Sequence, residues 1–181
     1  KGAIAQNGYL ALLNPSQLEK TKQLVIVKKH PLEPPEVSPV TTSIIFPSAV
    51  HGLTLTPDGS LAAVIGDEGY YSYLDISDGK LKEVKKPLLP ETGSSYYIFN
   101  SKFINAKTLA LGIQRRIGDP PKAMWKDCKI IIVNRNGDIL FEKEYPLKEA
   151  LSSVPGIDVT FDNRFIVGFT QDTAVLVELK D

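Results

Sequence analysis

Short runs of apolar residues, separated by clusters of turn-forming residues, follow one another along almost the whole chain. Such runs are typical of β-strands, whereas the longer period of an amphipathic helix is nearly absent. Only Pro15–Lys20 and Leu147–Leu151 resemble short helices. The pattern predicts an all-β protein with strands at Tyr9–Leu13, Gln23–Lys28, Gly52–Thr56, Leu61–Ile65, Tyr70–Ile76, Ser101–Ile104, Thr108–Gln114, Lys129–Asn134, Asp138–Tyr145, Gly156–Phe161, Phe165–Thr170 and Ala174–Leu179.

The predicted strands recur in four similar segments. Each segment holds a strand, a polar turn, a strongly apolar strand and a further strand, as in GLTLTPDGSLAAVIG and IDVTFDNRFIVGF. The equivalent turn positions are Asn7, Asp58, Asn105 and Asp162, at spacings of 51, 47 and 57 residues. A regular period of this length indicates a repeat architecture.

Each repeat fits one blade of a β-propeller, a four-stranded antiparallel sheet that runs outward from a central axis. Inner strands are buried on both faces between neighbouring blades, which accounts for the continuously apolar LAAVI, LALGI and FIVGF. We expect one domain over residues 1–181, with blades at about 1–46, 47–93, 94–150 and 151–181. Four blades leave sheet edges open, so we expect further blades of a seven-bladed type of ring, or a second copy, to close them. A two-sheet β-structure is the alternative.

Two resemblances follow from these motifs. LTLTPDGSLAAVIG with YLDISDGKL resembles a WD40/YVTN-type propeller blade, without the WD dipeptide and the GH pair. More narrowly, SAVHGLTLTPDGSLAAVIG, SKFINAKTLALGI and DTAVLVELKD, in that order, resemble the endoplasmic-reticulum exchange-factor family that activates the Sar-type coat GTPase. That resemblance implies guanine-nucleotide exchange on a small GTPase by a membrane-anchored protein. The family's exchange loop lies early in its propeller, and the resemblance assigns none of its residues here.

Composition narrows the function classes. Lys+Arg and Asp+Glu both number 21, so the net charge is zero and no nucleic-acid partner is expected. No apolar run is long enough to span a membrane. One cysteine and two histidines leave little for metal or triad chemistry, and no phosphate-binding glycine motif or GxSxG occurs. We therefore expect no cofactor, no metal and no catalytic residues. The single cysteine favours a reducing, cytoplasmic-facing location without assigning one.

The segment Arg115–Lys129, RRIGDPPKAMWKDCK, is the least ordinary part of the chain. It interrupts a blade between its second and third strands, and it holds the sole tryptophan and the sole methionine among basic residues. Arg and Trp dominate binding hot spots because they combine large area with directional contacts. We predict a protein-binding site, and the alternative is a solvated hairpin loop whose tryptophan packs back on the blade. The site residues are Arg115, Arg116, Met124, Trp125 and Lys126.

Other unusual segments have ordinary structural interpretations beside the functional ones. The proline-rich His30–Val40 could be a polyproline ligand, but a surface connection between blades is preferred. The basic run Lys80–Lys86 is interpreted as a solvated edge strand. His51, at a strand start, is interpreted as a hydrogen-bonding structural residue.

Two features could carry chemistry. Asp67 and Glu68, with Asp75 and Asp78, do not have the spacing of a calcium loop and are interpreted as turn carboxylates. Cys128 lies between Lys126 and Lys129, which could favour its thiolate, but no histidine is nearby in sequence.

The sequence leaves several functions open. The first is an interaction module or scaffold, non-catalytic by itself, which presents loops to a protein partner. Guanine-nucleotide exchange is a special case of it. A hydrolase or lactonase of the propeller kind and a self-assembling β-protein are the other hypotheses.

Overall fold

The computed structural model describes the backbone of residues 2–4, 9–14, 21–28, 36–38, 44–45, 50–66, 71–75, 82–85, 96–117, 124–144, 156–160, 162–169 and 174–179. Every regular element within these ranges is a β-strand, which confirms the all-β fold class. The predicted helices, Pro15–Lys20 and Leu147–Leu151, lie outside the described residues. Among the described residues, no helix is long and apolar enough to cross a membrane.

The strands form four antiparallel sheets in chain order, and each sheet holds one of the expected repeats. The first three sheets have a fourth, outer strand, and β5 (Ile44–Ile45) also pairs with β3. The first sheet contains β1 (Gly2–Ile4), β2 (Tyr9–Asn14), β3 (Thr21–Lys28) and β4 (Glu36–Ser38); the second β6 (Val50–Leu55), β7 (Leu61–Gly66), β8 (Tyr71–Asp75) and β9 (Lys82–Lys85); the third β10 (Tyr96–Asn105), β11 (Thr108–Ile117), β12 (Met124–Asn134) and β13 (Ile139–Glu144); the fourth β14 (Gly156–Val159), β15 (Phe165–Phe169) and β16 (Ala174–Glu178).

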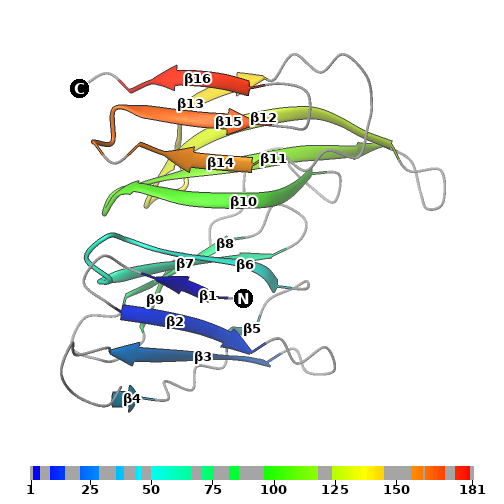
Figure 1. Ribbon diagram of the computed structural model, residues 1–181. Coiled ribbons are helices and arrows are strands. Elements are labelled where there is room, and N and C mark those ends of the chain that lie inside the picture. The colour runs from blue at the N-terminus through cyan, green and yellow to red at the C-terminus, as the bar shows by residue number, and fades with distance from the viewer. Residues whose placement is uncertain are drawn as a thin grey trace.

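The four sheets stack face to face in chain order, as Figure 1 shows from the first sheet at the bottom to the fourth at the top. The first strands of successive sheets lie next to each other: β1 contacts β6, β6 contacts β10, and β10 contacts β14. Each sheet then continues outward strand by strand from this inner row. This is the arrangement of blades around a propeller axis.

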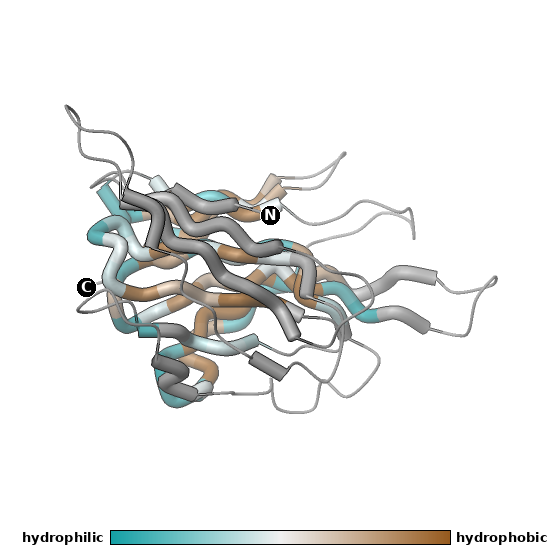
Figure 2. The backbone as a smooth tube through the Cα atoms, turned by 90° about the horizontal axis from the view of Figure 1, so that it is seen from below, coloured by the Kyte–Doolittle hydropathy of each residue, from teal (hydrophilic) through white to brown (hydrophobic). Residues whose placement is uncertain are grey.

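Two apolar cores hold the second, third and fourth sheets together. In β11, Leu109, Leu111 and Ile113 belong to the core against the second sheet, whereas Ala110 belongs to the core against the fourth. Because strand side chains alternate between faces, a strand covered on both sides needs apolar residues at every position. This confirms the interpretation of LALGI as an inner strand. In Figure 2 the hydrophobic residues follow the middle of the described strands.

Tyrosines reinforce the contact between the second and third sheets. Tyr71 and Tyr73 are fully buried, and their rings meet edge to face with centroids 5.7 Å apart. The hydroxyl of Tyr73 donates a hydrogen bond to the carbonyl of Asn134, at 3.3 Å, and so ties β8 to the next sheet. Burial raises the pKa of both phenols above their usual value, because the charged form would lose its hydration.

The outer strands correct one expectation and confirm another. Glu36–Ser38 of the proline-rich segment is β4, which pairs with β3, rather than part of a connection between blades. Proline lacks the N–H that a central strand needs, but it is tolerated beside an edge strand, and Pro35 and Pro39 flank this one. Lys82–Lys85, within the lysine-rich run, is the outer strand β9, as predicted.

Candidate functional site

The hairpin of β11 and β12 is longer than predicted. Residues from Arg115 onward were expected to form an inserted loop, but the ladder continues and pairs Arg115 with Lys126, Arg116 with Trp125, and Ile117 with Met124. The β-forming residues Ile117 and Trp125 extend the two strands, and the residues between Ile117 and Met124 lie outside the described ranges. Figure 1 shows this hairpin projecting beyond the other strands at the right-hand end.

The register brings all five predicted site residues onto one two-stranded ribbon. Directly paired residues of an antiparallel ladder are close neighbours, so Arg116 and Trp125 form one pair and Arg115 and Lys126 the next. A register shift between Ile113 and Arg115 marks a bulge where the ribbon leaves the sheet. Bulges re-aim side chains and increase local twist. Gln114, which lies in the bulge, is buried, and Arg115 after it is half-buried.

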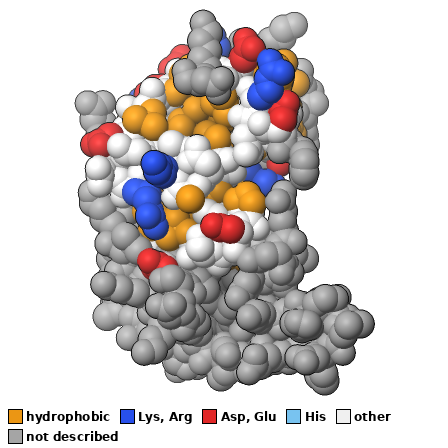
Figure 3. Space-filling model, turned by 90° about the vertical axis from the view of Figure 1, so that its left-hand side faces the viewer, with side chains coloured by type: hydrophobic (Ala, Val, Ile, Leu, Met, Phe, Trp, Pro, Cys, Tyr) orange, Lys and Arg blue, Asp and Glu red, His pale blue; other side chains and the backbone are white. Residues whose placement is uncertain are grey.

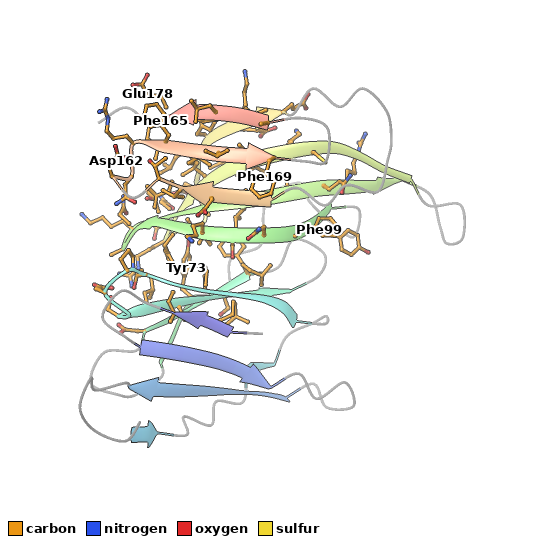
Figure 4. The ribbon with its side chains drawn as sticks, viewed as in Figure 1. Tyr73, Phe99, Asp162, Phe165, Phe169 and Glu178 are labelled. Carbon is orange, nitrogen blue, oxygen red and sulfur yellow. The ribbon has the colours of Figure 1, made fainter. Side chains whose placement is uncertain are left out.

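Two aromatic residues that sequence reasoning missed lie beside this ribbon. Tyr97 is paired with Gln114 at the start of β10, and its ring lies 6.4 Å from that of Phe99. Both side chains are half-buried, and Figure 4 shows Phe99 at the same end of the molecule as the hairpin. The signal was present as the run Tyr96-Tyr97-Ile98-Phe99, which begins a strand that was predicted to start only at Ser101.

We call this part of the third sheet the hairpin rim. It consists of Tyr97 and Phe99 from β10 and the five predicted residues of β11 and β12. Arginine and aromatic residues together are the composition of binding hot spots.

Lys129 and Cys128 have structural roles instead. The ammonium of Lys129 forms an ion pair with Glu142 and lies 3.4 Å from a carboxylate oxygen of Glu144, both on β13. It therefore belongs to the sheet rather than to the basic residues of the rim. Cys128 is fully buried in the core between the third and fourth sheets, so reagents and partners do not reach it in the folded protein.

The opposite end of the stack carries the polar turns that defined the repeat. In the second sheet the Asp58 carboxylate accepts hydrogen bonds from the Thr56 hydroxyl, at 2.6 Å, and from the Ser60 amide, at 3.1 Å. The Leu61 amide donates to the Thr56 hydroxyl at 3.1 Å. The bonds to the carboxylate hold the pKa of Asp58 below its usual value, the Thr56 hydroxyl contributing most.

The fourth sheet repeats these three hydrogen bonds. Asp162 accepts from the Thr160 hydroxyl at 2.6 Å and from the Arg164 amide at 3.1 Å, and the Phe165 amide donates to Thr160 at 3.0 Å. The pKa of Asp162 is lowered for the same reason, with the Thr160 hydroxyl as the largest cause. Gly59 and Asn163, with φ of 69° and 56°, hold the left-handed turn position.

Asn105 caps the corresponding turn of the third sheet. Its side-chain oxygen accepts from the amides of Lys107 and Thr108, at 2.8 and 3.0 Å. These three positions thus stabilise turns, as predicted, while Asn7, Asp67, Glu68 and Asp78 lie outside the described residues. Within the described ranges no group of three metal-ligating side chains is found. Figure 3 shows the end of the stack that carries these turns, where acidic, basic and apolar side chains are mixed.

Comparison with known proteins identifies the fold. No protein-family model matches the sequence, and no curated protein matches it. Among solved structures, KlAtg21 in complex with the coiled coil of AgAtg16 matches with a TM-score of 0.67 and 16% identity, over 100% of this chain and 53% of that one. The Cps50 (Swd1) β-propeller domain of Myceliophteria thermophila matches with a TM-score of 0.62 and 13% identity, over 99% and 51%.

A candidate 6-phosphogluconolactonase of Bacteroides uniformis also matches, with a TM-score of 0.65 and 16% identity, over 99% of this chain and 50% of that one. The chain spans about half the length of each of these structures. At such identities the likeness shows the fold alone, and that fold is a β-propeller.

Proposed function

We propose that this chain is a protein-interaction module built on β-propeller blades, and that the hairpin rim binds the partner. One observation carries the proposal: the β11–β12 ladder continues past the first residue of β10 and pairs Arg116 with Trp125, two positions beyond Gln114, which pairs with the half-buried Tyr97. A ribbon that projects from a packed sheet can insert into a partner without unfolding any core. The complex of KlAtg21 with the coiled coil of AgAtg16 gives a precedent for protein binding by a chain of similar fold.

A photo-crosslinking amino acid at position 125 tests the proposal. The matched control places the same amino acid at Leu140, which is 55% exposed on β13 of the same sheet. We expect a discrete crosslinked protein from position 125 that is absent from position 140. Equal crosslinking from both positions would contradict the proposal. Crosslinking of the partner from another position but not from position 125 would place the binding site elsewhere.

The resemblance to the Sar-activating exchange factors supplies the first partner to try, a small GTPase of the Sar type. If the chain catalyses guanine-nucleotide exchange, it should accelerate the release of a fluorescent guanine nucleotide from that GTPase. Binding of the GTPase without faster nucleotide release would support the interaction module and contradict exchange activity in this segment. The hydrolase hypothesis rests on the fold alone, and it would gain support if a metal ion raised the melting temperature.

A further inference from the structure

The hairpin rim differs from the rest of the chain in charge. Residues 115–126 contain four basic residues and one acidic residue, so this stretch carries a net charge of +3, whereas the whole chain is neutral. The basic residues are Arg115, Arg116, Lys122 and Lys126. Three of them, Arg115, Arg116 and Lys126, belong to the β11–β12 ladder itself. The positive charge is therefore built into the paired strands.

The register brings these charges together. Arg115 pairs directly with Lys126, and Arg116 follows in the next position of the ladder. Like charges at directly paired positions repel each other and destabilise a ladder. A carboxylate beside such a pair is attracted by both members. The ribbon therefore suits an acidic ligand better than a neutral one.

Within the sheet, the same strand β12 has acidic neighbours. The register between β12 and β13 ends where Lys129 pairs with Glu144, and the Lys129 ammonium also forms an ion pair with Glu142. From Lys129 toward Met124, no described strand pairs with β12 on this side. The described part of β13 thus supplies carboxylates to Lys129 but pairs none with Lys126.

The base of the ribbon also contains an unsatisfied hydrogen-bond donor. Gln114 is 1% exposed, and its amide Nε2 has no acceptor among the described residues. A buried amide without an acceptor is unfavourable. Gln114 pairs with Tyr97, whose half-buried ring lies beside that of Phe99. Positive charge, a donor and aromatic surface therefore occur together at this end of the third sheet.

We propose that the partner segment bound by the hairpin rim is an acidic peptide, with at least two carboxylates next to an apolar side chain. The carboxylates neutralise Arg115, Arg116 and Lys126, and the apolar side chain packs on Tyr97 and Phe99. This inference rests on the proposed function of the rim and adds the chemical class of its partner. A nucleic acid is less well suited, because the positive charge is confined to one short ribbon of a neutral chain.

Fluorescence anisotropy with labelled peptides tests the proposal. Three peptides of equal length alternate leucine with glutamate, with lysine or with glutamine. The glutamate peptide should bind at least about tenfold more tightly than the other two, because its charge complements that of the rim. Its affinity should fall at least about threefold between about 50 and 200 mM salt, because salt screens exposed charges.

Charge variants locate the binding and provide a matched control. Arg116→Gln with Lys126→Gln should weaken binding of the glutamate peptide at least about fivefold. Lys107→Gln with Lys143→Gln removes two exposed charges elsewhere on the third sheet, and should leave the affinity unchanged. Arg116→Glu with Lys126→Glu should reverse the preference toward the lysine peptide, a change that misfolding does not produce. Unchanged affinity of the first variant would contradict the proposal.

Crosslinking separates this inference from the proposed function. Capture of the glutamate peptide by a photo-crosslinker at position 125, but not by one at Leu140, would support both. Capture of the lysine or glutamine peptide in preference from position 125 would keep the rim as the binding site and overturn its acidic partner. Capture of the glutamate peptide from position 140 but not from 125 would overturn the rim, and this inference with it.

Two further results of the same assays would overturn the inference. One is equal or absent binding of all three peptides. The other is a single-stranded oligonucleotide of equal charge that binds at least as tightly as the glutamate peptide and crosslinks from position 125, because the ligand would then be a nucleic acid.

Discussion

Two leucines allow a matched test of how the sheets stack. Leu111 is fully buried on β11 in the core between the second and third sheets, whereas Leu176 is 65% exposed on β16 of the fourth sheet. Both lie in strands and both are replaced by alanine, so the chemical change and the change in β-propensity are the same. Only the covering by a neighbouring sheet differs.

The expected magnitudes follow from burial. Leu111→Ala removes three carbon atoms from a dry site, which is worth about 2.5 kcal/mol of transfer free energy at about 0.8 kcal/mol per methylene. The cavity left behind raises the loss of unfolding free energy to about 3–5 kcal/mol. Leu176→Ala gives up at most about a third of the transfer term, so we expect a loss below about 1 kcal/mol.

Urea unfolding followed by tryptophan fluorescence and circular dichroism measures the difference. With a slope of about 2–3 kcal/mol per molar urea, the midpoint should fall by about 1 M or more for Leu111→Ala and by less than about 0.5 M for Leu176→Ala. Equal shifts for both variants would refute the stacking of the third sheet on the second, because burial is then not what separates the two sites.

Other predictions concern the turns, the glycines and the hairpin. Asp58 has a lowered pKa in the folded chain, so the stability that its carboxylate contributes is fully present above about pH 3.9, the pKa of the unfolded chain, and is lost as the pH falls through the lowered value. The difference in unfolding free energy between the wild type and Asp58→Asn, measured by urea titration, should therefore shrink between about pH 5 and pH 2. Gly156→Ala should cost less than about 1 kcal/mol in the same assay, because the Phe169 ring that its Cβ would overlap is 47% exposed and can turn away, and a loss of several kcal/mol would show that the ring is held in place. Arg116→Ala with Trp125→Ala should leave the unfolding free energy within about 1 kcal/mol, because the hairpin leaves the sheet there; loss of folding would show that Trp125 is core.

The inner strands and turns could be predicted from sequence because their physical causes are local. A strand covered on both faces must be apolar at every position, so Leu61–Ile65 was evident, as was the Asp58 turn before it. The length of the β11–β12 hairpin was not evident, because Arg115 and Arg116 resemble loop residues until Trp125 and Lys126 pair with them. This pairing joins two separate strands, so the residue pattern of either strand alone does not predict it.

The sequence also did not predict which strands form the sheet edges or which sheet faces are exposed. Glu36–Ser38 gave no strand signal, because its pairing depends on the neighbouring β3 rather than on its own residues. The exposure of Leu176 was likewise invisible, because AVLVE has the pattern of a covered strand, and only the arrangement of the four sheets shows which face lacks a neighbour among the described strands.

The affinity of the crosslinked partner for a Trp125→Ala chain tests the central proposal most directly. Calorimetric titration would compare the wild type, Trp125→Ala and Leu140→Ala, with melting temperatures measured on the same samples. Partner binding by the hairpin rim predicts at least about a tenfold loss of affinity for Trp125→Ala, unchanged affinity for Leu140→Ala and similar melting temperatures for all three. Wild-type affinity for Trp125→Ala, or an equal loss for Leu140→Ala, would contradict it.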